Sequence, residues 1–192
     1  MHRVRLELET LTATFVHADT DEARWRAAPF RGLARWWFRA IVGAAYDPSE
    51  VYRREAEVFG TAESPSPVTF RVFPVSGGSP VDVDVNPGGQ RSGRRKAFPA
   101  GSKLRLDIQT NSRSTDASRF VADAHAAMWV GLQLGGVGQR ARRGGGSLRV
   151  TSCQPNSSLG LPTSTDARQF ADELTSGLAL ARQQLRAERI RT

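Results

Sequence analysis

The chain has 192 residues, with 27 Lys or Arg against 19 Asp or Glu, so its formal net charge is +8 and its isoelectric point lies near 11.0. Its hydrophobic fraction of 39% and charged fraction of 24% are typical of a folded globular protein and exclude wholesale disorder. The lone Cys153 excludes an intramolecular disulfide and a cysteine-based zinc site, and the three histidines form no ligand cluster, so we expect no metal and no cofactor. No apolar run reaches membrane-spanning length and no charged leader precedes an apolar stretch, so we expect a cytoplasmic protein that contacts no membrane.

The first third of the chain predicts a strand, two helices and a second strand. Residues 3–15 alternate between apolar and polar, which is the period of a half-buried strand. Pro29 is placed to open a helix, which ends before a second, shorter helix that Pro48 opens and Gly60 stops. Residues 68–75 predict the next strand. The apolar residues of the first helix recur at helical spacing, and we place them in the core: Leu33, Trp36, Trp37, Ala40, Ile41 and Ala44.

The remaining chain predicts a hairpin, two strands and two helices. Residues 76–101 are rich in Gly, Pro and Ser, and we interpret them as a long hairpin or insertion with a short strand at 81–85 and a basic run after it. An alternating strand at 103–109 precedes a helix that begins at Thr115 or Asp116 and ends at Gly135. A loop rich in Gly and Arg leads to a last sheet strand from Leu148, and a C-terminal helix follows over 170–185.

This order of elements predicts an α+β fold of the ferredoxin-like (RRM-like) type, with an antiparallel sheet and helices on one of its faces. We expect residues 1–153 to form this domain. Residues 154–192 would form a linker and a C-terminal helix that packs on the domain or extends from it.

Three arginine-rich stretches are candidates for contact with a nucleic-acid backbone, because guanidinium groups grip phosphate and a helix N-terminus adds free N–H groups. In each of them, a solvated basic surface is the alternative interpretation. One of them is the glycine-rich loop from Gly135 to Ser147. It is not a P-loop, because it carries no Gly-Lys-Ser/Thr ending, and it is not a dinucleotide fingerprint, because it follows a helix and opens a strand. The candidate RNA-binding residues are Arg31, Arg35, Arg39, Arg94, Arg95, Lys96, Gly136, Gly138, Arg140, Arg142 and Arg143.

The loop after the first strand offers an alternative, enzymatic interpretation. It contains His17, Asp19 and Asp21, and a histidine beside carboxylates can take the proton of an RNA 2′-hydroxyl. A lone histidine in a polar loop is more often an ordinary loop residue, so we expect no catalytic residue, with these three as the alternative.

Three ordered motifs resemble the RAMP proteins of type III CRISPR systems, and among these the subunits of the Cmr (type III-B) effector complex. They are Phe30-Arg31-Gly32-Leu33-Ala34-Arg35-Trp36-Trp37-Phe38-Arg39-Ala40, then Glu55-Ala56-Glu57-Val58-Phe59-Gly60 with Ser66-Pro67-Val68, then the loop from Gly135 to Ser147. The resemblance covers Leu6 to about Val150. It implies a ferredoxin-like RAMP domain without nuclease activity that binds crRNA or the crRNA–target RNA duplex beside other RAMP and Cas subunits. An endoribonuclease that cleaves target RNA or precursor crRNA, and a self-standing RNA-binding module, remain the alternatives.

Overall fold

Four antiparallel strands form the main sheet of the computed structural model, which describes residues 2–17, 22–85, 93–110 and 112–187. The strand order is β2-β5-β1-β6. Because two long crossovers each contain a helix, the chain order strand, helix, strand, strand, helix, strand gives the predicted ferredoxin-like arrangement. The strands are β1 (His2–Thr10), β2 (Val68–Ser76), β5 (Lys103–Thr110) and β6 (Leu148–Gln154).

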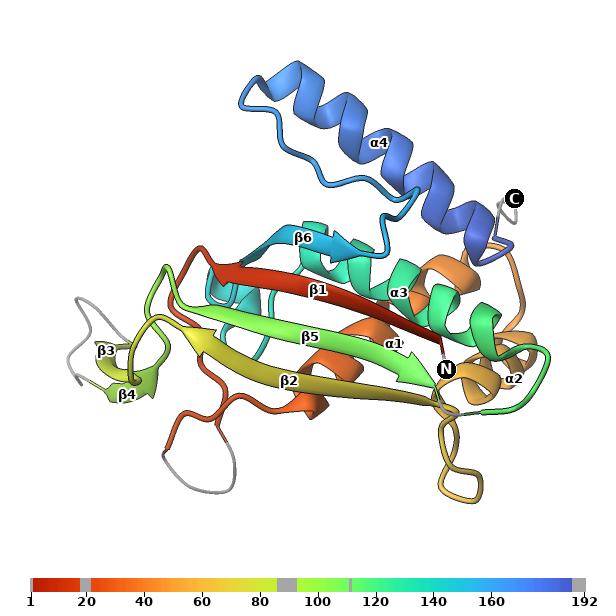
Figure 1. Cartoon of the computed structure of the whole chain (residues 1–192), viewed down its shortest axis with the longest axis horizontal. Helices are drawn as coiled ribbons and strands as arrows, with labels where there is room; N and C mark the ends of the chain where they lie inside the picture. The colour runs from red at the N-terminus through yellow and green to blue at the C-terminus, as the bar shows by residue number, and fades with distance from the viewer. Residues whose placement is uncertain (1, 18–21, 86–92, 111, 188–192) are drawn as a thin grey trace.

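The two faces of the sheet differ sharply in polarity. Helices α1 (Ala27–Gly43) and α3 (Ala117–Leu134) cover one face, and no helix lies over most of the other, which is turned toward the viewer in Figure 1. The apolar side chains of the central strands point to the helices, where they are fully buried. The buried apolar residues of β1, β2 and β5 are Leu6, Leu8, Val68, Phe70, Leu104, Leu106 and Ile108. The alternation that predicted the strands therefore separates a helix-covered face from an open polar face.

The predicted apolar face of α1 is partly wrong. The buried residues of the helix are Phe30, Ala34, Phe38 and Val42, whereas Trp36 is 52% exposed and Ala40 and Ala44 are also exposed. The helix is flanked on one side by α3 and on the other by α2 (Pro48–Phe59). Its buried stripe is therefore centred between these two neighbours, which leaves Trp36 on the solvent side.

The predicted first strand is also too long. β1 leaves the sheet after Thr10, and the chain continues with single bridges from Thr14 to Phe98 and from Phe15 to Gln139. The predicted hairpin is present as an antiparallel ribbon of β3 (Val81–Asp84) and β4 (Arg94–Ala97). The ribbon lies beyond one end of the main sheet (Figure 1).

The C-terminal helix α4 (Ala167–Gln184) packs against α3 on the side of the molecule near β6 (Figure 1). Gly177 faces the ring of Trp129, and the indole N–H of Trp129 donates a 2.9 Å hydrogen bond to the carbonyl oxygen of Gly160 in the preceding linker. The linker and helix thereby extend the core with buried Leu159 and Ala181. Within the described ranges, no helix has the length and apolar character needed to cross a membrane.

Candidate nucleic-acid interface

The glycine-rich loop between α3 and β6 is folded back on itself. The amide N–H of Val137 donates to the carbonyl oxygen of Gly146 over 2.8 Å, and the N–H of Gly145 donates to that of Arg140 over 3.1 Å. A short 3-10 helix (Ala141–Arg143) forms the tip. The backbone of Arg140 is left-handed, with φ of 65°, which turns the chain into this tip.

The same loop is fastened along the segment that follows β1. The N–H of Gln139 donates to the Phe15 carbonyl over 2.9 Å, and the N–H of Gly146 donates to the Ala13 carbonyl over 3.0 Å. Gly138 belongs to this seam, with a φ of 89°. Contacts of Gly136 and Gly138 with phosphate remain a prediction, but their lack of a side chain already allows this close backbone packing.

The arginines of the tip carry charges that no described residue neutralises. Arg142 and Arg143 are exposed, and Arg140 is half-buried. Across the residues that the structure describes, the guanidinium groups of these three arginines form no hydrogen bond and no ion pair. A fixed backbone therefore holds three guanidinium groups that have no partner among the described residues, two of them exposed.

A pocket of about 390 Å³ lies beside the loop, at the N-terminus of α1. Its lining residues are Phe15, Val16, His17, Arg26, Pro29, Leu33, Gly136, Gly138 and Gln139. The first turn of α1 has no acidic residue and no side-chain cap, so its free N–H groups make this end of the helix positive.

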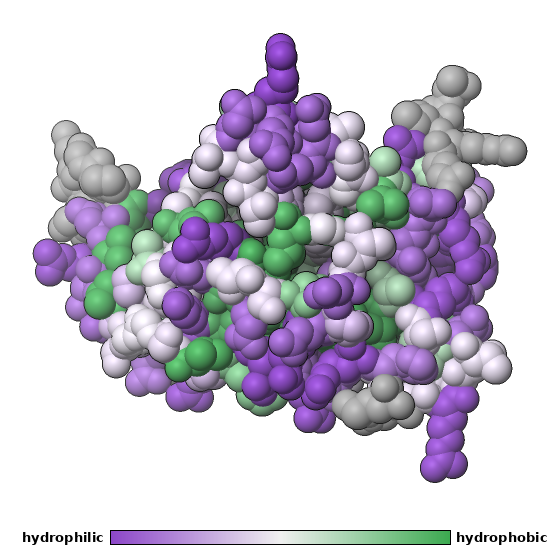
Figure 2. All heavy atoms as spheres, turned by 45° about the horizontal axis from the view of Figure 1, so that its top comes forward, coloured by the Kyte–Doolittle hydropathy of each residue, from purple (hydrophilic) through white to green (hydrophobic). Residues whose placement is uncertain are grey.

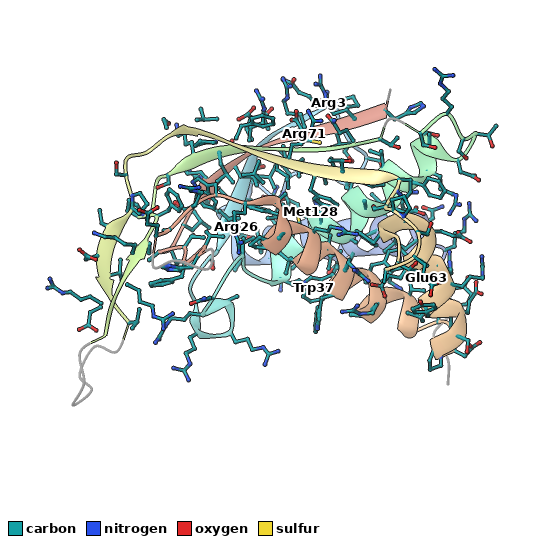
Figure 3. All side chains as sticks on the ribbon, turned by 90° about the horizontal axis from the view of Figure 1, so that it is seen from below. Arg3, Arg26, Trp37, Glu63, Arg71 and Met128 are labelled. Atoms are coloured by element: carbon teal, nitrogen blue, oxygen red, sulfur yellow. The ribbon has the colours of Figure 1, made fainter. Side chains whose placement is uncertain are left out.

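Arg26 strengthens the positive character of this pocket, and the sequence interpretation did not select it. One of its terminal nitrogens (Nη2) donates to the carbonyl oxygen of His17 over 2.6 Å. Its Nε, like Nε2 of His17, is buried without a hydrogen-bond partner in the described part of the chain. The available signal was its position directly before the helix that Pro29 opens. Figure 3 shows Arg26 at the start of α1.

The three arginines of α1 have partners on α2. Arg31 donates to the carbonyl oxygen of Phe59 at the end of that helix. Nε of Arg35 lies 2.6 Å and Nη1 of Arg39 lies 3.0 Å from the same carboxylate oxygen of Glu55, which is buried. These arginines therefore join α1 to α2, and their contact with RNA remains a prediction.

The basic run of the hairpin approaches the glycine-rich loop. Nη1 of Arg95 in β4 donates a 3.0 Å hydrogen bond to Oε1 of Gln139. Lys96 forms an ion pair of 2.9 Å with Asp82 on the neighbouring strand, and Arg94 is exposed. The structure thus brings Arg95 to Gln139 of the glycine-rich loop, while Arg35 and Arg39 are held on the α2 side of α1.

The alternative catalytic residues are only partly described. His17 lies in the pocket wall, whereas Asp19 and Asp21 lie outside the described residues. Within the described ranges, no three His, Cys, Asp or Glu side chains are grouped as a metal site would require.

Comparisons with known proteins identify the family. The chain is 30% identical over 188 residues to the CRISPR system Cmr subunit Cmr1-1 of Pyrococcus furiosus, with 88% of this chain and 54% of that protein covered. It is 29% identical over 184 residues to subunit Cmr1-2 of the same organism, with 78% and 96% covered. The chain thus spans about half the length of the first of these relatives.

Solved structures agree with these relatives. The crystal structure of apo Cmr1 from Pyrococcus furiosus superposes with a TM-score of 0.74 at 27% identity, over 96% of this chain and 61% of that one. A chain of the type III-B Cmr-beta complex bound to cognate target RNA shares the fold, with a TM-score of 0.70 at 14% identity, over 93% and 62%. The sequence pattern of the RAMP superfamily matches residues 7–149. This chain belongs to the RAMP superfamily and resembles the Cmr1 subunit of type III-B systems.

Proposed function

We propose that the protein is a non-catalytic subunit of a type III CRISPR ribonucleoprotein that binds the backbone of crRNA or of the crRNA–target duplex through its glycine-rich loop. The observation that carries this proposal is that Arg140, Arg142 and Arg143 lie on a loop fastened to the core, with no hydrogen-bond or ion-pair partner for their guanidinium groups among the described residues. Charges held in place by a rigid backbone bind phosphate without a large loss of side-chain and loop entropy.

The family supports RNA and other RAMP or Cas subunits as the partners. The relatives are named as Cmr subunits, and one solved structure with this fold belongs to a complex bound to target RNA. In guide-directed recognition, base pairing reads the sequence, so a protein subunit needs to hold backbone and shape. The loop offers charge and backbone donors and has no aromatic side chain for stacking on bases, which fits this division of roles.

Charge removal at the loop tip tests the proposal. In Arg142→Gln/Arg143→Gln, RNA affinity should fall, and the slope of log affinity against log salt should become shallower by about 1.4 for a single strand, because two phosphate contacts are lost. The matched control is Arg113→Gln/Arg168→Gln, which removes the same charge from exposed sites on other parts of the surface. Equal behaviour of the two variants would refute the assignment of the loop.

The endoribonuclease alternative rests on His17, whose unpaired Nε2 lies in the pocket wall near the N-terminus of α1. Incubating the purified ribonucleoprotein with target RNA separates the two functions. A cleavage product that disappears in His17→Ala, Asp19→Ala or Asp21→Ala would establish the enzyme. Identical products from all four proteins would leave this subunit with a binding role.

A further inference from the structure

The open face of the sheet carries its own group of arginines, well apart in the sequence from the glycine-rich loop. Figure 3 shows Arg3 and Arg71 on the side of the sheet opposite to Met128 and Trp37, which lie on the helix side. Hydrophilic residues cover much of the surface seen in Figure 2, interrupted by smaller hydrophobic patches. This face is separate from the pocket beside α1, so it needs its own explanation.

A single buried carboxylate lies at the centre of these arginines. Asp107 in β5 is 3% exposed, and its oxygens lie 3.1 Å from Nε of Arg5, 3.5 Å from Nε of Arg105 and 3.9 Å from Nη1 of Arg3. Strand pairing places Arg5 opposite Asp107 on one side and Arg71 opposite it on the other. Three guanidinium groups therefore lie around the Asp107 carboxylate, and Arg71 is beside them on the neighbouring strand. Glu7 pairs with Arg105 on the same face, so four arginines stand against two carboxylates and the centre of the face keeps a positive excess.

The geometry holds these cations in place and leaves donors free. The guanidinium of Arg105 lies over the ring of Phe73, 4.2 Å from the ring centroid, which fixes its plane. Its Nε is buried and finds no acceptor in hydrogen-bond geometry within the described chain. Arg71 is exposed. We define the arginine cluster as Arg3, Arg5, Arg71 and Arg105 around Asp107. Contacts with Asp107 and Phe73 hold its guanidinium groups at the sheet surface, and N–H groups on their solvent side are free to donate to a ligand.

We propose that this arginine cluster binds the phosphodiester backbone of an RNA strand that crosses the open face of the sheet. Side chains on one face of a strand repeat about every 7 Å, which suits successive phosphates of an extended strand. A phosphodiester backbone is favoured over a protein partner, because interfaces with nucleic acid are much more positively charged than those between proteins and this cluster has a positive excess. The proposal adds a second RNA surface to the proposed function and does not depend on the loop arginines.

The test compares two pairs of exposed arginines in the full chain. Arg3→Gln/Arg71→Gln should weaken binding of a fluorescent uridine homopolymer of about 16 nucleotides by about tenfold and lower the salt slope by about 1.4. Arg113→Gln/Arg168→Gln is the control, with the smaller loss expected from net charge alone. Arg5 and Arg105 are left intact because they hold Asp107, and Arg3→Lys/Arg71→Lys should restore most of the salt slope because the charge returns.

Crosslinking gives a second readout that does not depend on affinity. RNA that carries 4-thiouridine should crosslink to peptides of β1, β2 and β5. The proposal is overturned if the wild-type chain does not bind RNA at about 50 mM salt. It is also overturned if Arg3→Gln/Arg71→Gln and Arg113→Gln/Arg168→Gln lose the same RNA affinity, or if RNA crosslinks only to the glycine-rich loop. It is equally overturned if Arg3→Gln/Arg71→Gln changes the sedimentation of the chain and leaves its RNA affinity intact, because the face would then bind protein. A loss in Arg3→Gln/Arg71→Gln with none in Arg142→Gln/Arg143→Gln refutes only the loop assignment, and the reverse result refutes only this one.

Discussion

Gly138 lies so close to Phe15 that a Cβ atom on it would be 2.3 Å from the Phe15 carbonyl oxygen. The contact belongs to the seam where the glycine-rich loop meets the segment after β1, and it also requires a φ of 89°. The close contact leaves no room for a side chain at this position, and the positive φ adds backbone strain for any residue but glycine. The fixed placement of the loop arginines therefore depends on this glycine as well as on the charges themselves.

We predict that Gly138→Ala destabilises the protein by about 3 kcal/mol or more, because it combines backbone strain with a clash against backbone atoms. Gly144 is the matched control. It has a similar φ of 77°, but a Cβ atom there would meet open space, so Gly144→Ala should cost about 1 kcal/mol. Urea unfolding measures both variants. Equal losses would show that the seam is not formed in solution.

Because His125 is buried, we predict that the free energy of unfolding falls under mildly acidic conditions. Burial of the ring lowers the pKa of His125 to about 4, from 6.5 in the unfolded chain. The unfolded state therefore takes up a proton first as the pH falls below 6.5, and the folded state loses stability until about pH 4 is reached. Between pH 7.5 and pH 5 this linkage should remove about 2 kcal/mol from the free energy of unfolding.

The variant His125→Leu isolates this effect. Among the described residues, the ring has one side-chain contact in hydrogen-bond range, the sulfur of Cys153, which lies 4.0 Å from Nε2, so an apolar residue can occupy the site. Urea titrations at both pH values should show a much smaller pH dependence in His125→Leu, and an unchanged one in His2→Gln, where the ring is exposed. Asp123 acts in the opposite sense, because burial raises its pKa, and it is present in all three proteins. An identical pH dependence in His125→Leu would exclude His125 as the source.

The adjacent Trp36 and Trp37 should differ in their contribution to stability. Trp36 is 52% exposed, whereas the ring of Trp37 packs beside Gly131 of α3 and beside Gly135, which follows the helix. Trp36→Ala should therefore cost less than about 1 kcal/mol, and Trp37→Ala about 3 kcal/mol. Thermal unfolding with circular dichroism measures both. A larger loss for Trp36→Ala would contradict the observed orientation of α1.

Trp36 and Trp37 also show which part of the fold could not be predicted from the sequence. The alternation in β1 and β5 was sufficient to predict the sheet, because a two-residue period assigns each side chain to a face. A helical period, in contrast, left Trp36 and Trp37 equivalent, and only the positions of α2 and α3 separate them. The predicted fold is confirmed, and the roles of the predicted RNA-binding residues remain predictions.

The contacts within the candidate sites could not be predicted from the sequence, for a related reason. Arg5 meets Asp107 through the register of strands that lie far apart in the chain. Arg95 reaches Gln139 only because the hairpin ribbon folds toward the loop. Sequence motifs identified the arginines of α1 and of the loop as one class, and the structure distinguishes those with internal partners from those without.

The docking of α4 on α3 depends on the absence of a side chain at Gly177. A Cβ atom there would lie 2.2 Å from Cη2 of Trp129, and this ring is buried and tied to Gly160 by its indole N–H. An alanine in a helix interior is normally worth about 1 kcal/mol more than glycine, so Gly177→Ala would stabilise an isolated α4.

We predict the opposite for Gly177→Ala in the whole chain: α4 shifts off α3, and trypsin cleaves faster at Arg168 and Arg182. Ser176→Ala, at the neighbouring exposed position, should leave cleavage unchanged. Slower cleavage of Gly177→Ala would show that α4 is not packed on Trp129 in solution, because only helix propensity would then decide the result.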